Sequence, residues 1–280
     1  MRILVTGGMG FIGRHLCNYL EQIGHEVVSF DLLADIRNYE ETLFILDAVR
    51  PDVVYHLAAL ASVRDSLVNP HDYIDTNITG TLNMLLASTA AKVKQFVFVS
   101  SGGTVYGEPT NLPVPDTHRL VPNDIYGLSK LTGEHLTRII CSMNGCIYYN
   151  LRYPNVYGPG QSGEGEAGVV AIFAKKMLYG ETPIINGDGE QTRDFMFVED
   201  VVRASVSVLG RPPGSYNIGT GVEVSVNQIA GHLCQLTHYQ GNVKYSPPKA
   251  GEVRRMSLRP SFPMEYTTLR RGLELTVESF

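Results

Sequence analysis

The sequence predicts an α/β fold in which a doubly wound parallel sheet is followed by a smaller C-terminal lobe. Short β-rich runs alternate with helical patterns through the first half of the chain, and a glycine-rich turn joins the first run to the first helical pattern. After Arg152 the pattern changes, because loops rich in Gly and Pro separate shorter elements. Strands that alternate with helices imply right-handed crossovers and a parallel sheet. We therefore expect one domain over residues 1–152 and a substrate-binding lobe mainly over 153–280, with some segments of the lobe returning to the sheet.

Each predicted element of the first domain follows from its residue pattern. Buried strands are rich in β-branched and aromatic residues, whereas helices repeat apolar residues every three to four positions. On these criteria we expect strands at 3–5, 26–30, 53–57, 95–99 and 146–151, and helices at 11–23, 73–91 and 126–141.

Composition narrows the class of protein. A chain of 280 residues with 44% hydrophobic and 18% charged residues can bury a large core, and its net charge of -5 argues against nucleic-acid binding. We expect neither a signal peptide nor a membrane span, because no apolar run approaches the roughly 18 residues that a span requires. The four cysteines lack metal-ligand spacing, so we expect packed, reduced thiols, no metal site and a cytoplasmic location. They are Cys17, Cys141, Cys146 and Cys234.

A glycine-rich turn follows the first predicted strand and opens the first predicted helix, where residues 6–13 read TGGMGFIG. In this context Gly7 allows a tight turn, Gly10 lets the backbone approach a pyrophosphate, and Gly13 lets helix and strand pack closely. The free N–H groups at the start of the helix, at Phe11 and Ile12, then face the anion together with the positive end of the helix dipole. The motif predicts a Rossmann-type dinucleotide site.

An acidic residue marks the end of the second predicted strand. Asp31 lies 18 residues after Gly13, where a carboxylate accepts hydrogen bonds from the adenosine ribose hydroxyls and repels a 2′-phosphate. The sequence therefore predicts NAD rather than NADP as the cofactor.

A candidate proton-transfer pair stands further along the chain. Tyr126 and Lys130 are four residues apart, so on a helix they share one face. An ordinary tyrosine is a poor base at neutral pH, and we expect the lysine cation to stabilise the phenolate and bring its pKa toward the working range. The strand before them ends in small hydroxyl and glycine residues from Ser100 to Gly107, and a hydroxyl there could share the substrate proton with Tyr126.

These motifs together resemble the extended short-chain dehydrogenase/reductase family, and most closely its nucleotide-sugar epimerase branch. The resemblance covers nearly the whole chain. It rests on residues 6–13, 56–59, 77–81, 100–107, 126–130, 151–159 and 187–195.

The resemblance assigns further residues to the cofactor and to the substrate. On the cofactor side it implies a pair of residues that contact the adenine and a loop that lines the cofactor. It also implies residues that support the cofactor and one that lies near the nicotinamide. These are Asp35, Ile36, Leu57, Ala58, Ala59, Asn77, Ser100 and Tyr153. On the substrate side it implies nucleotide contacts at Asn155, Val169, Asn186, Arg193, Lys249 and Glu252. Of these, Asn155 and Arg193 would hold the pyrophosphate, and a guanidinium grips phosphate oxygens through its planar fork.

Three departures from the family pattern are visible. Gly102 occupies the usual position of the catalytic Ser or Thr, which leaves Ser101 as the candidate and Thr104 behind it. Lys249 replaces an arginine before the pair formed by Gly251 and Glu252. The stretch from Asp31 to Asp35 is much shorter than usual, as is the segment after Pro260, so we expect a more open adenine pocket and a more exchangeable cofactor.

The resemblance implies C4 epimerisation of a UDP-sugar, by default UDP-glucose and UDP-galactose, through a 4-keto intermediate with NAD. In this scheme Tyr126 takes the proton of the sugar 4-hydroxyl, while Lys130 holds the nicotinamide ribose. It also implies a homodimer through helices at 70–91 and 125–143.

Alternatives remain open from the sequence. A 4,6-dehydratase would need an Asp-Glu pair where Gly102 and Gly103 stand, and Asp31 argues against a 4-ketoreductase that releases NADP. A non-catalytic NAD or sugar-nucleotide sensor tends to lose the reactive pair, which is present here.

Overall fold

The computed structural model describes residues 1–31, 34–164, 168–248 and 253–280. These residues form two compact units. The first comprises Met1–Tyr106, Arg119–Arg152 and Ser205–Tyr216, and the second comprises Gly107–His118, Tyr153–Ala204 and Asn217–Phe280. No helix among the described residues is both long and apolar enough to span a bilayer.

The first unit is built on a six-stranded sheet with the order β10-β5-β4-β3-β1-β2. Its strands are β1 Arg2–Thr6, β2 Glu26–Ser29, β3 Val53–His56, β4 Gln95–Ser101, β5 Ile147–Tyr153 and β10 Gly214–Asn217. β1 pairs in parallel with β2 on one side and β3 on the other, and β3 pairs in parallel with β4. The strand order therefore reverses direction at β1, and ligands of doubly wound sheets bind at such a switch point.

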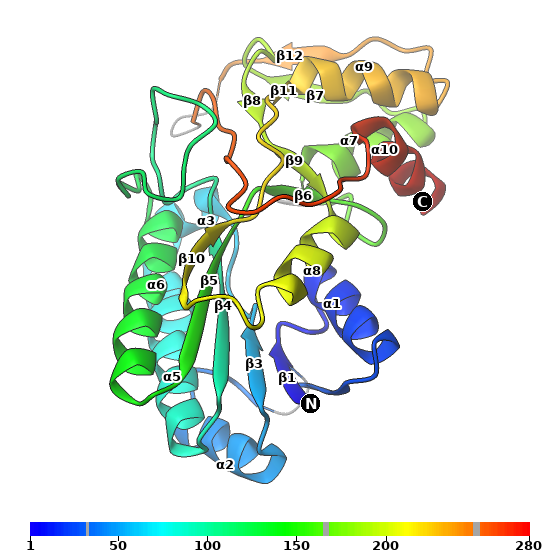
Figure 1. The fold of residues 1–280 in the computed structure, drawn as a ribbon. Coiled ribbons are helices and arrows are strands. Elements are labelled where there is room, and N and C mark those ends of the chain that lie inside the picture. The colour runs from blue at the N-terminus through cyan, green and yellow to red at the C-terminus, as the bar shows by residue number, and fades with distance from the viewer. Residues whose placement is uncertain (32–33, 165–167, 249–252) are drawn as a thin grey trace. The chain divides into compact units, whose positions relative to one another are not determined.

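Helices cover both faces of this sheet. They are α1 Phe11–Gln22, α2 Tyr39–Val49, α3 Val63–Val68, α4 Pro70–Tyr73, α5 Gly80–Ala90 and α6 Ile125–Met143, with a π-helical segment, η1, at Ile74–Thr79. Figure 1 shows α5 and α6 side by side on one face and α1 on the other. The predicted fold class and the five predicted strands are confirmed. The helix expected over 73–91 is present, since α4, the π-helical segment and α5 follow one another without a break, but the π-helical segment was not expected and α2 is absent from the predicted elements.

The core of the first unit lies between the sheet and the α2, α5 and α6 layer. β1, β3 and β4 are almost wholly buried, which explains their continuous apolar sequence. Cys141 and Cys146 lie in this core, and all four cysteines are free, as expected.

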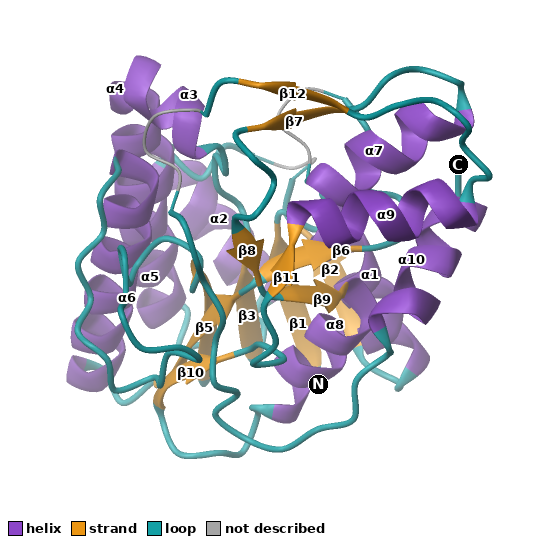
Figure 2. Ribbon diagram, turned by 90° about the horizontal axis from the view of Figure 1, so that it is seen from above, coloured by secondary structure: helices purple, strands orange, loops and turns teal. Residues whose placement is uncertain are grey.

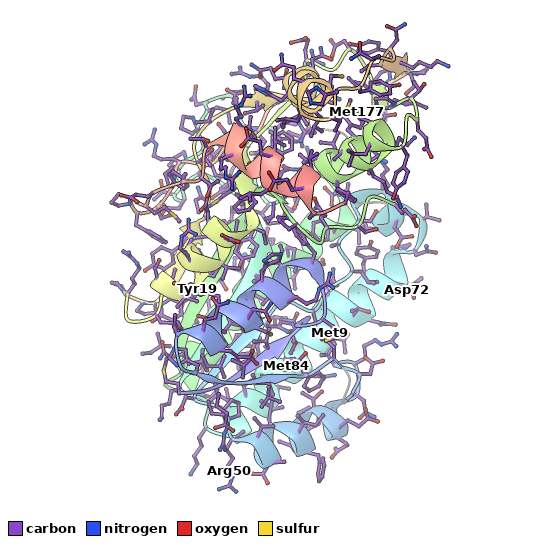
Figure 3. The ribbon with its side chains drawn as sticks, turned by 90° about the vertical axis from the view of Figure 1, so that its right-hand side faces the viewer. Met9, Tyr19, Arg50, Asp72, Met84 and Met177 are labelled. Atoms are coloured by element: carbon purple, nitrogen blue, oxygen red, sulfur yellow. The ribbon has the colours of Figure 1, made fainter. Side chains whose placement is uncertain are left out.

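The second unit packs three helices around a separate core. These are α7 Val169–Leu178, α9 Val226–Leu236 and α10 Leu269–Glu278, while α8 Val198–Ser207 runs from this unit into the first. Figure 2 shows α7, α9 and α10 close together, and Met177, labelled in Figure 3, belongs to the core that they enclose. Three short two-stranded sheets complete the unit, formed by β6 Asn155–Tyr157 with β9 Phe195–Phe197, β7 Ile184–Asn186 with β12 Lys244–Ser246, and β8 Thr192–Arg193 with β11 Val224–Ser225.

Candidate active site

The glycine-rich turn connects β1 to α1 with very little space around it. Gly7 has φ +72°, and a Cβ on Gly13 would lie 1.9 Å from the carbonyl oxygen of Gly7. Gly10 is the N-cap of α1 and offers no side chain, so the first amides of the helix, at Phe11 and Ile12, remain for a ligand. The turn thus fits a pyrophosphate approached by backbone alone.

Asp31 lies against this turn. Its two carboxylate oxygens accept hydrogen bonds from the backbone N–H groups of Gly7, at 2.5 Å, and Met9, at 2.6 Å. Met9, labelled in Figure 3, has a side chain that is 52% exposed. The carboxylate is therefore fixed beside the turn, where it would repel a 2′-phosphate.

A cavity of about 560 Å³ opens at the carboxyl ends of β2 and β3. Five predicted cofactor residues line it, namely Asp31, Asp35, Ile36, Ala58 and Ala59. Four residues that the sequence analysis did not name also line it, namely Phe30, Ala34, Leu60 and Thr76. Its volume and its largely apolar lining suit an adenine and its ribose. Leu57 does not line this cavity, and residues 32–33 of the shortened segment lie outside the described residues.

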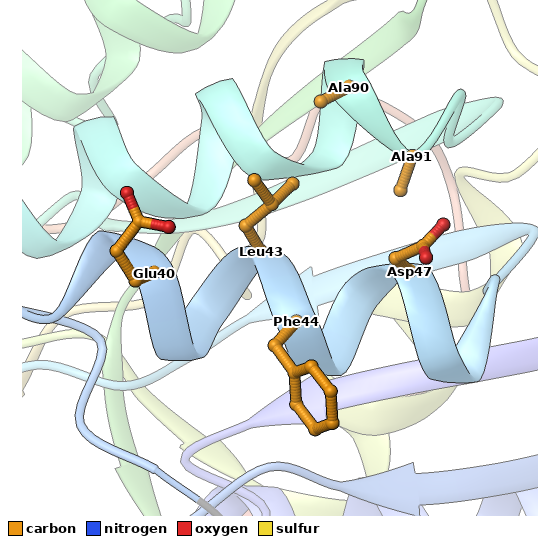
Figure 4. Close-up of a pocket in the computed structure, with 6 residues that line it drawn as sticks. All are labelled: Glu40, Leu43, Phe44, Asp47, Ala90 and Ala91. Carbon is orange, nitrogen blue, oxygen red and sulfur yellow. The ribbon is translucent and has the colours of Figure 1, made fainter.

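Asn83 supports one wall of the cavity, although the sequence analysis did not name it. Its side-chain amide donates to the carbonyl oxygens of Ile36, at 3.0 Å, and Arg37, at 2.9 Å. A buried asparagine on an otherwise apolar helix was the available signal, because such a side chain needs hydrogen-bond partners. Another cavity, of about 310 Å³ between α2 and α5, contains none of the predicted site residues (Figure 4).

Asn77 connects the cofactor loop to the helix of the reactive pair. Its Oδ1 accepts from the N–H of Leu60 at 2.8 Å, and its Nδ2 donates to the carbonyl oxygen of Leu60 at 2.9 Å and to Ser129 Oγ at 3.0 Å. Asn77 lies inside the π-helical segment, and such segments are frequent at functional sites.

The buried imidazole of His56, on β3, links β1 to α5. Its ring nitrogens lie 2.7 Å from Thr6 Oγ1 and 3.0 Å from Thr81 Oγ1. Burial lowers the pKa of His56 to about 3, so the imidazole is neutral at working pH.

Tyr126 and Lys130 project from the first turns of α6 toward β4. The Lys130 ammonium donates to the carbonyl oxygen of Val99 at 2.8 Å and lies 5.9 Å from the centroid of the Tyr126 ring. The ring of Tyr73 packs edge-on against that of Tyr126, with centroids 6.5 Å apart. Asp124 begins the helix by accepting the N–H of Gly127 at 2.7 Å. The ring of Tyr126 is therefore held on several sides.

Ser101 is the hydroxyl residue beside the tyrosine. Its side chain acts to lower the pKa of Tyr126, whereas Gly102 has no side chain to offer. The Thr104 hydroxyl points instead to the carbonyl oxygen of Ser101, at 3.5 Å. Ser100, expected on the cofactor side, gives its hydroxyl to Glu134 Oε1 at 2.6 Å. The hydroxyl proton of Ser100 is therefore already used within the protein.

The pKa of Tyr126 differs from the value that the sequence leads us to expect. Burial raises the pKa of Tyr126 to about 12 against the opposing influence of the Ser101 side chain, and burial lowers the pKa of Lys130 to about 8. The expected fall in the tyrosine pKa is therefore wrong for the protein chain alone. The physical reason is that desolvation of the phenolate outweighs the influence of Ser101, and the negative charges of Asp124 and Tyr73 act in the same direction as desolvation.

The predicted substrate residues lie in the second unit. Asn155 is exposed on β6, and its N–H donates to the carbonyl oxygen of Asp194 at 2.9 Å, which brings it next to Arg193 on β8. Asn186 ends β7 and its Oδ1 accepts from Ser246 Oγ at 3.0 Å. Tyr153, at the end of β5, is buried, and Val169 begins α7. Lys249 and Glu252 lie outside the described residues.

Asp194, which the sequence analysis did not assign, anchors the segment beside Arg193. Its buried carboxylate accepts from the Thr220 hydroxyl at 2.6 Å, from the Gly221 N–H at 3.0 Å and from the Leu258 N–H at 3.0 Å. A carboxylate directly before the apolar strand Phe195–Phe197 was the available signal, because a buried carboxylate must be bonded.

Comparison with known proteins agrees with this geometry. The model of the NAD-dependent epimerase/dehydratase family matches residues 3–219. A putative UDP-glucose 4-epimerase of Methanocaldococcus jannaschii is 41% identical over 91% of this chain and 89% of its own length. A UDP-N-acetyl-alpha-D-glucosaminuronate decarboxylase of Bacillus cytotoxicus is 33% identical over 88% of this chain and 83% of its own. The crystal structure of a UDP-glucose 4-epimerase from Thermotoga maritima, solved with UDP-glucose, superposes with a TM-score of 0.96 at 39% identity, covering 100% of this chain and 98% of that one.

Proposed function

Since the chain belongs to the NAD-dependent epimerase/dehydratase family, we propose that it interconverts UDP-glucose and UDP-galactose by epimerisation at C4. Membership confirms the predicted family resemblance and NAD as the cofactor. The reaction and the sugar are the proposal, because the family also contains relatives named as decarboxylases.

One observation carries the proposal, namely that Tyr126 stands on α6 with the Lys130 ammonium 5.9 Å from its ring centroid and with the Ser101 side chain acting to lower its pKa. A phenol in such surroundings can move one proton from and back to a sugar hydroxyl. Glycines at 102 and 103 leave no carboxylate pair there for an elimination, which supports epimerisation over dehydration.

The glycine turn, Asp31 and the cavity beside them fit NAD, which supplies a hydride acceptor and donor when bound. In the proposed reaction Tyr126, as the phenolate, removes the proton of the 4-hydroxyl and later returns it to the new 4-hydroxyl. Ser101 donates a hydrogen bond to the phenolate and so favours its formation. Lys130 contributes a positive charge 5.9 Å from the centroid of the Tyr126 ring, and it would hold the nicotinamide ribose. Because each proton is returned, the enzyme ends the cycle in its starting protonation state.

Anchoring of the substrate would come from the second unit. Arg193 and Asn155 would hold the pyrophosphate, while Asn186, Val169, Lys249 and Glu252 would contact the remainder of the nucleotide. Binding energy placed on the nucleotide leaves the sugar free to present either face to the same reactive groups.

Assembly and location complete the proposal. α5 and α6 contact each other and carry exposed apolar side chains at Leu86, Leu128, Ile139 and Met143, of which Met143 is 79% exposed. We infer a homodimer through this face.

Four free cysteines suit a reducing compartment, which supports a cytoplasmic location.

The test is to incubate the purified protein with NAD and UDP-galactose and to separate the products by chromatography with mass detection. Formation of UDP-glucose with no net NADH would support the proposal, and the Tyr126→Phe variant is the control. Parallel reactions with UDP-N-acetylgalactosamine and UDP-glucuronate extend the test. A product lighter by water would indicate dehydration, and one lighter by carbon dioxide would indicate decarboxylation, and either would replace the proposed reaction.

A further inference from the structure

A buried ion pair lies behind the reactive residues and has no part in the proposed proton transfer. Arg152 Nη2 lies 2.7 Å from Glu134 Oε2, Arg152 Nε lies 3.0 Å from Glu134 Oε1, and the two side chains are only 5% and 4% exposed. A buried pair of this kind contributes little net stability, because desolvation offsets the attraction of the charges. Its presence therefore calls for another explanation, which its remaining hydrogen bonds supply.

The pair holds both ends of the segment that carries Ser101. At one end Ser100 Oγ donates to Glu134 Oε1 at 2.6 Å, and at the other end Arg152 Nη1 donates to Tyr106 Oη at 2.7 Å. Between them the N–H groups of residues 104 and 105 donate to the carbonyl oxygen of Ser101, at 3.3 and 3.1 Å. The segment 100–106 is thus a compact turn tied down at each end by one partner of the ion pair.

The same glutamate fixes the helix of the reactive pair. Tyr126, Lys130 and Glu134 are each four residues apart, so they lie on one face of α6. Lys130 bonds with the carbonyl oxygen of Val99 and Glu134 with Ser100 Oγ, while the Ser101 side chain acts on the pKa of Tyr126, and all three partners lie on β4. Helix and strand approach closely at Gly133, where a Cβ would lie 2.3 Å from the Phe98 ring. Three residues on one face of α6 therefore lie next to three successive residues of β4, from Val99 to Ser101.

We propose that the Glu134–Arg152 ion pair is a positioning device that holds the segment bearing Ser101 in place beside Tyr126. The inference rests on the proposed function, since it takes Tyr126 as the group that moves the proton. Glu134 and Arg152 act through Ser100 and Tyr106 on the segment between them, so they are positioning residues. A displacement of about 1 Å at such a site can lower a rate by roughly a hundredfold.

The sharpest variant is Tyr106→Phe. Replacing Glu134 would leave Arg152 buried without its carboxylate and destabilise the whole unit, whereas Tyr106→Phe keeps the ion pair and removes one tether. The matched control is Tyr149→Phe. Tyr149 is equally buried in the same unit, and its hydroxyl donates to Gln95 Oε1 at 3.3 Å or to the Arg211 carbonyl at 3.2 Å.

In the holoenzyme we expect Tyr106→Phe to lower kcat about tenfold with an unchanged KM, and Tyr149→Phe to leave kcat within twofold. In a Ser101→Ala background the Tyr106→Phe change should cause no further loss, because the tether acts through Ser101. Hydrogen exchange provides a readout without substrate. The amide of Val105 should exchange about tenfold faster in Tyr106→Phe, with the melting temperature close to that of the parent protein.

The possible outcomes separate the inference from the proposed function. Unchanged exchange at Val105, or losses of kcat that multiply in the double variant, would overturn the positioning role. Faster exchange with non-additive kcat losses would support it. If the parent protein converts no nucleotide sugar, the proposed function fails, and the exchange of Val105 then decides by itself whether the ion pair holds the segment.

Discussion

The reactive end of the first unit and the proposed phosphate-binding residues of the second unit are built differently. Tyr126 and Lys130 stand on a long helix, bonded to a buried strand, and are supported by a buried ion pair. In contrast, Asn155 is exposed and Arg193 lies on a two-residue strand. The difference indicates that the proposed proton-transfer residues stand on preorganised elements, whereas the proposed nucleotide-sugar contacts stand on short strands and loops. Variants in the first unit should therefore change kcat or NAD affinity, and variants in the second should change KM.

The largest effect is expected from Tyr126→Phe. Loss of the only proposed proton-transfer hydroxyl should lower kcat about a thousandfold, since general acid–base catalysis contributes roughly 10²–10⁴-fold. NAD affinity and KM should stay close to those of the parent protein, measured by titration and steady-state kinetics. Tyr19→Phe, on α1, is the control (Figure 3). Activity within a few-fold of the parent protein would remove Tyr126 from the mechanism.

A smaller effect, on the cofactor alone, is expected from Gly13→Ala. The added Cβ would meet the carbonyl oxygen of Gly7 at 1.9 Å, so the turn must move, and NAD affinity should fall on the order of a hundredfold. Calorimetric titration with NAD and with UDP should show loss of the first and retention of the second. Gly231→Ala, where the new Cβ would meet nothing within 4 Å, is the control. Equal NAD affinity in both variants would place the pyrophosphate elsewhere.

Arg193→Met should weaken the binding of the nucleotide sugar and leave the binding of NAD unchanged. Removing a charge-assisted hydrogen bond costs about 1.5–3 kcal/mol, so KM for the nucleotide sugar should rise roughly tenfold to a hundredfold, with NAD affinity unchanged. Arg254→Met is the control, because the Arg254 guanidinium is exposed and pairs with Asp188 at 2.8 Å. If the control raised KM as much as Arg193→Met did, the assignment of the phosphate-binding arginine would need revision.

The smallest effect concerns the pH dependence of stability. The pKa of His56 falls from 6.5 to about 3 on folding, so between these values the unfolded chain binds a proton that the folded chain does not. The free energy of unfolding should therefore decrease as pH falls from 6.5 toward 3, by up to about 1.4 kcal/mol per pH unit from this group. Urea unfolding of the parent protein and of His56→Gln measures the slope, with exposed His135→Gln as the control. Equal slopes in all three proteins would contradict the buried, neutral imidazole.

The first unit was largely predictable from its sequence. The glycine turn, Asp31 and the pair formed by Tyr126 and Lys130 each depend on local spacing, which secondary structure converts directly into geometry. Ser101 was named from the family resemblance, because Gly102 stands at the usual position of the catalytic Ser or Thr, and its side chain acts to lower the pKa of Tyr126. The pKa of Tyr126 was not predictable, because it depends on the burial that the whole fold imposes.

Contacts between distant residues escaped the sequence analysis. Glu134 meets Arg152 across 18 residues, and Asp194 meets Leu258 across 64, and no local pattern indicates such partners. The π-helical segment within the predicted helix 73–91 has a similar origin, because buried Asn77 is held there by Leu60 and Ser129. Tertiary hydrogen bonds thus decided the features that periodicity missed.

We propose that the chain inverts C4 of a UDP-sugar while Tyr126 moves only the hydroxyl proton. A decisive experiment uses UDP-galactose carrying deuterium at C4, incubated with the enzyme in ordinary water and followed by mass spectrometry and NMR of the products. We expect UDP-glucose that retains the deuterium at C4. Loss of the deuterium to water, or the absence of any UDP-glucose while NAD is bound, would contradict it.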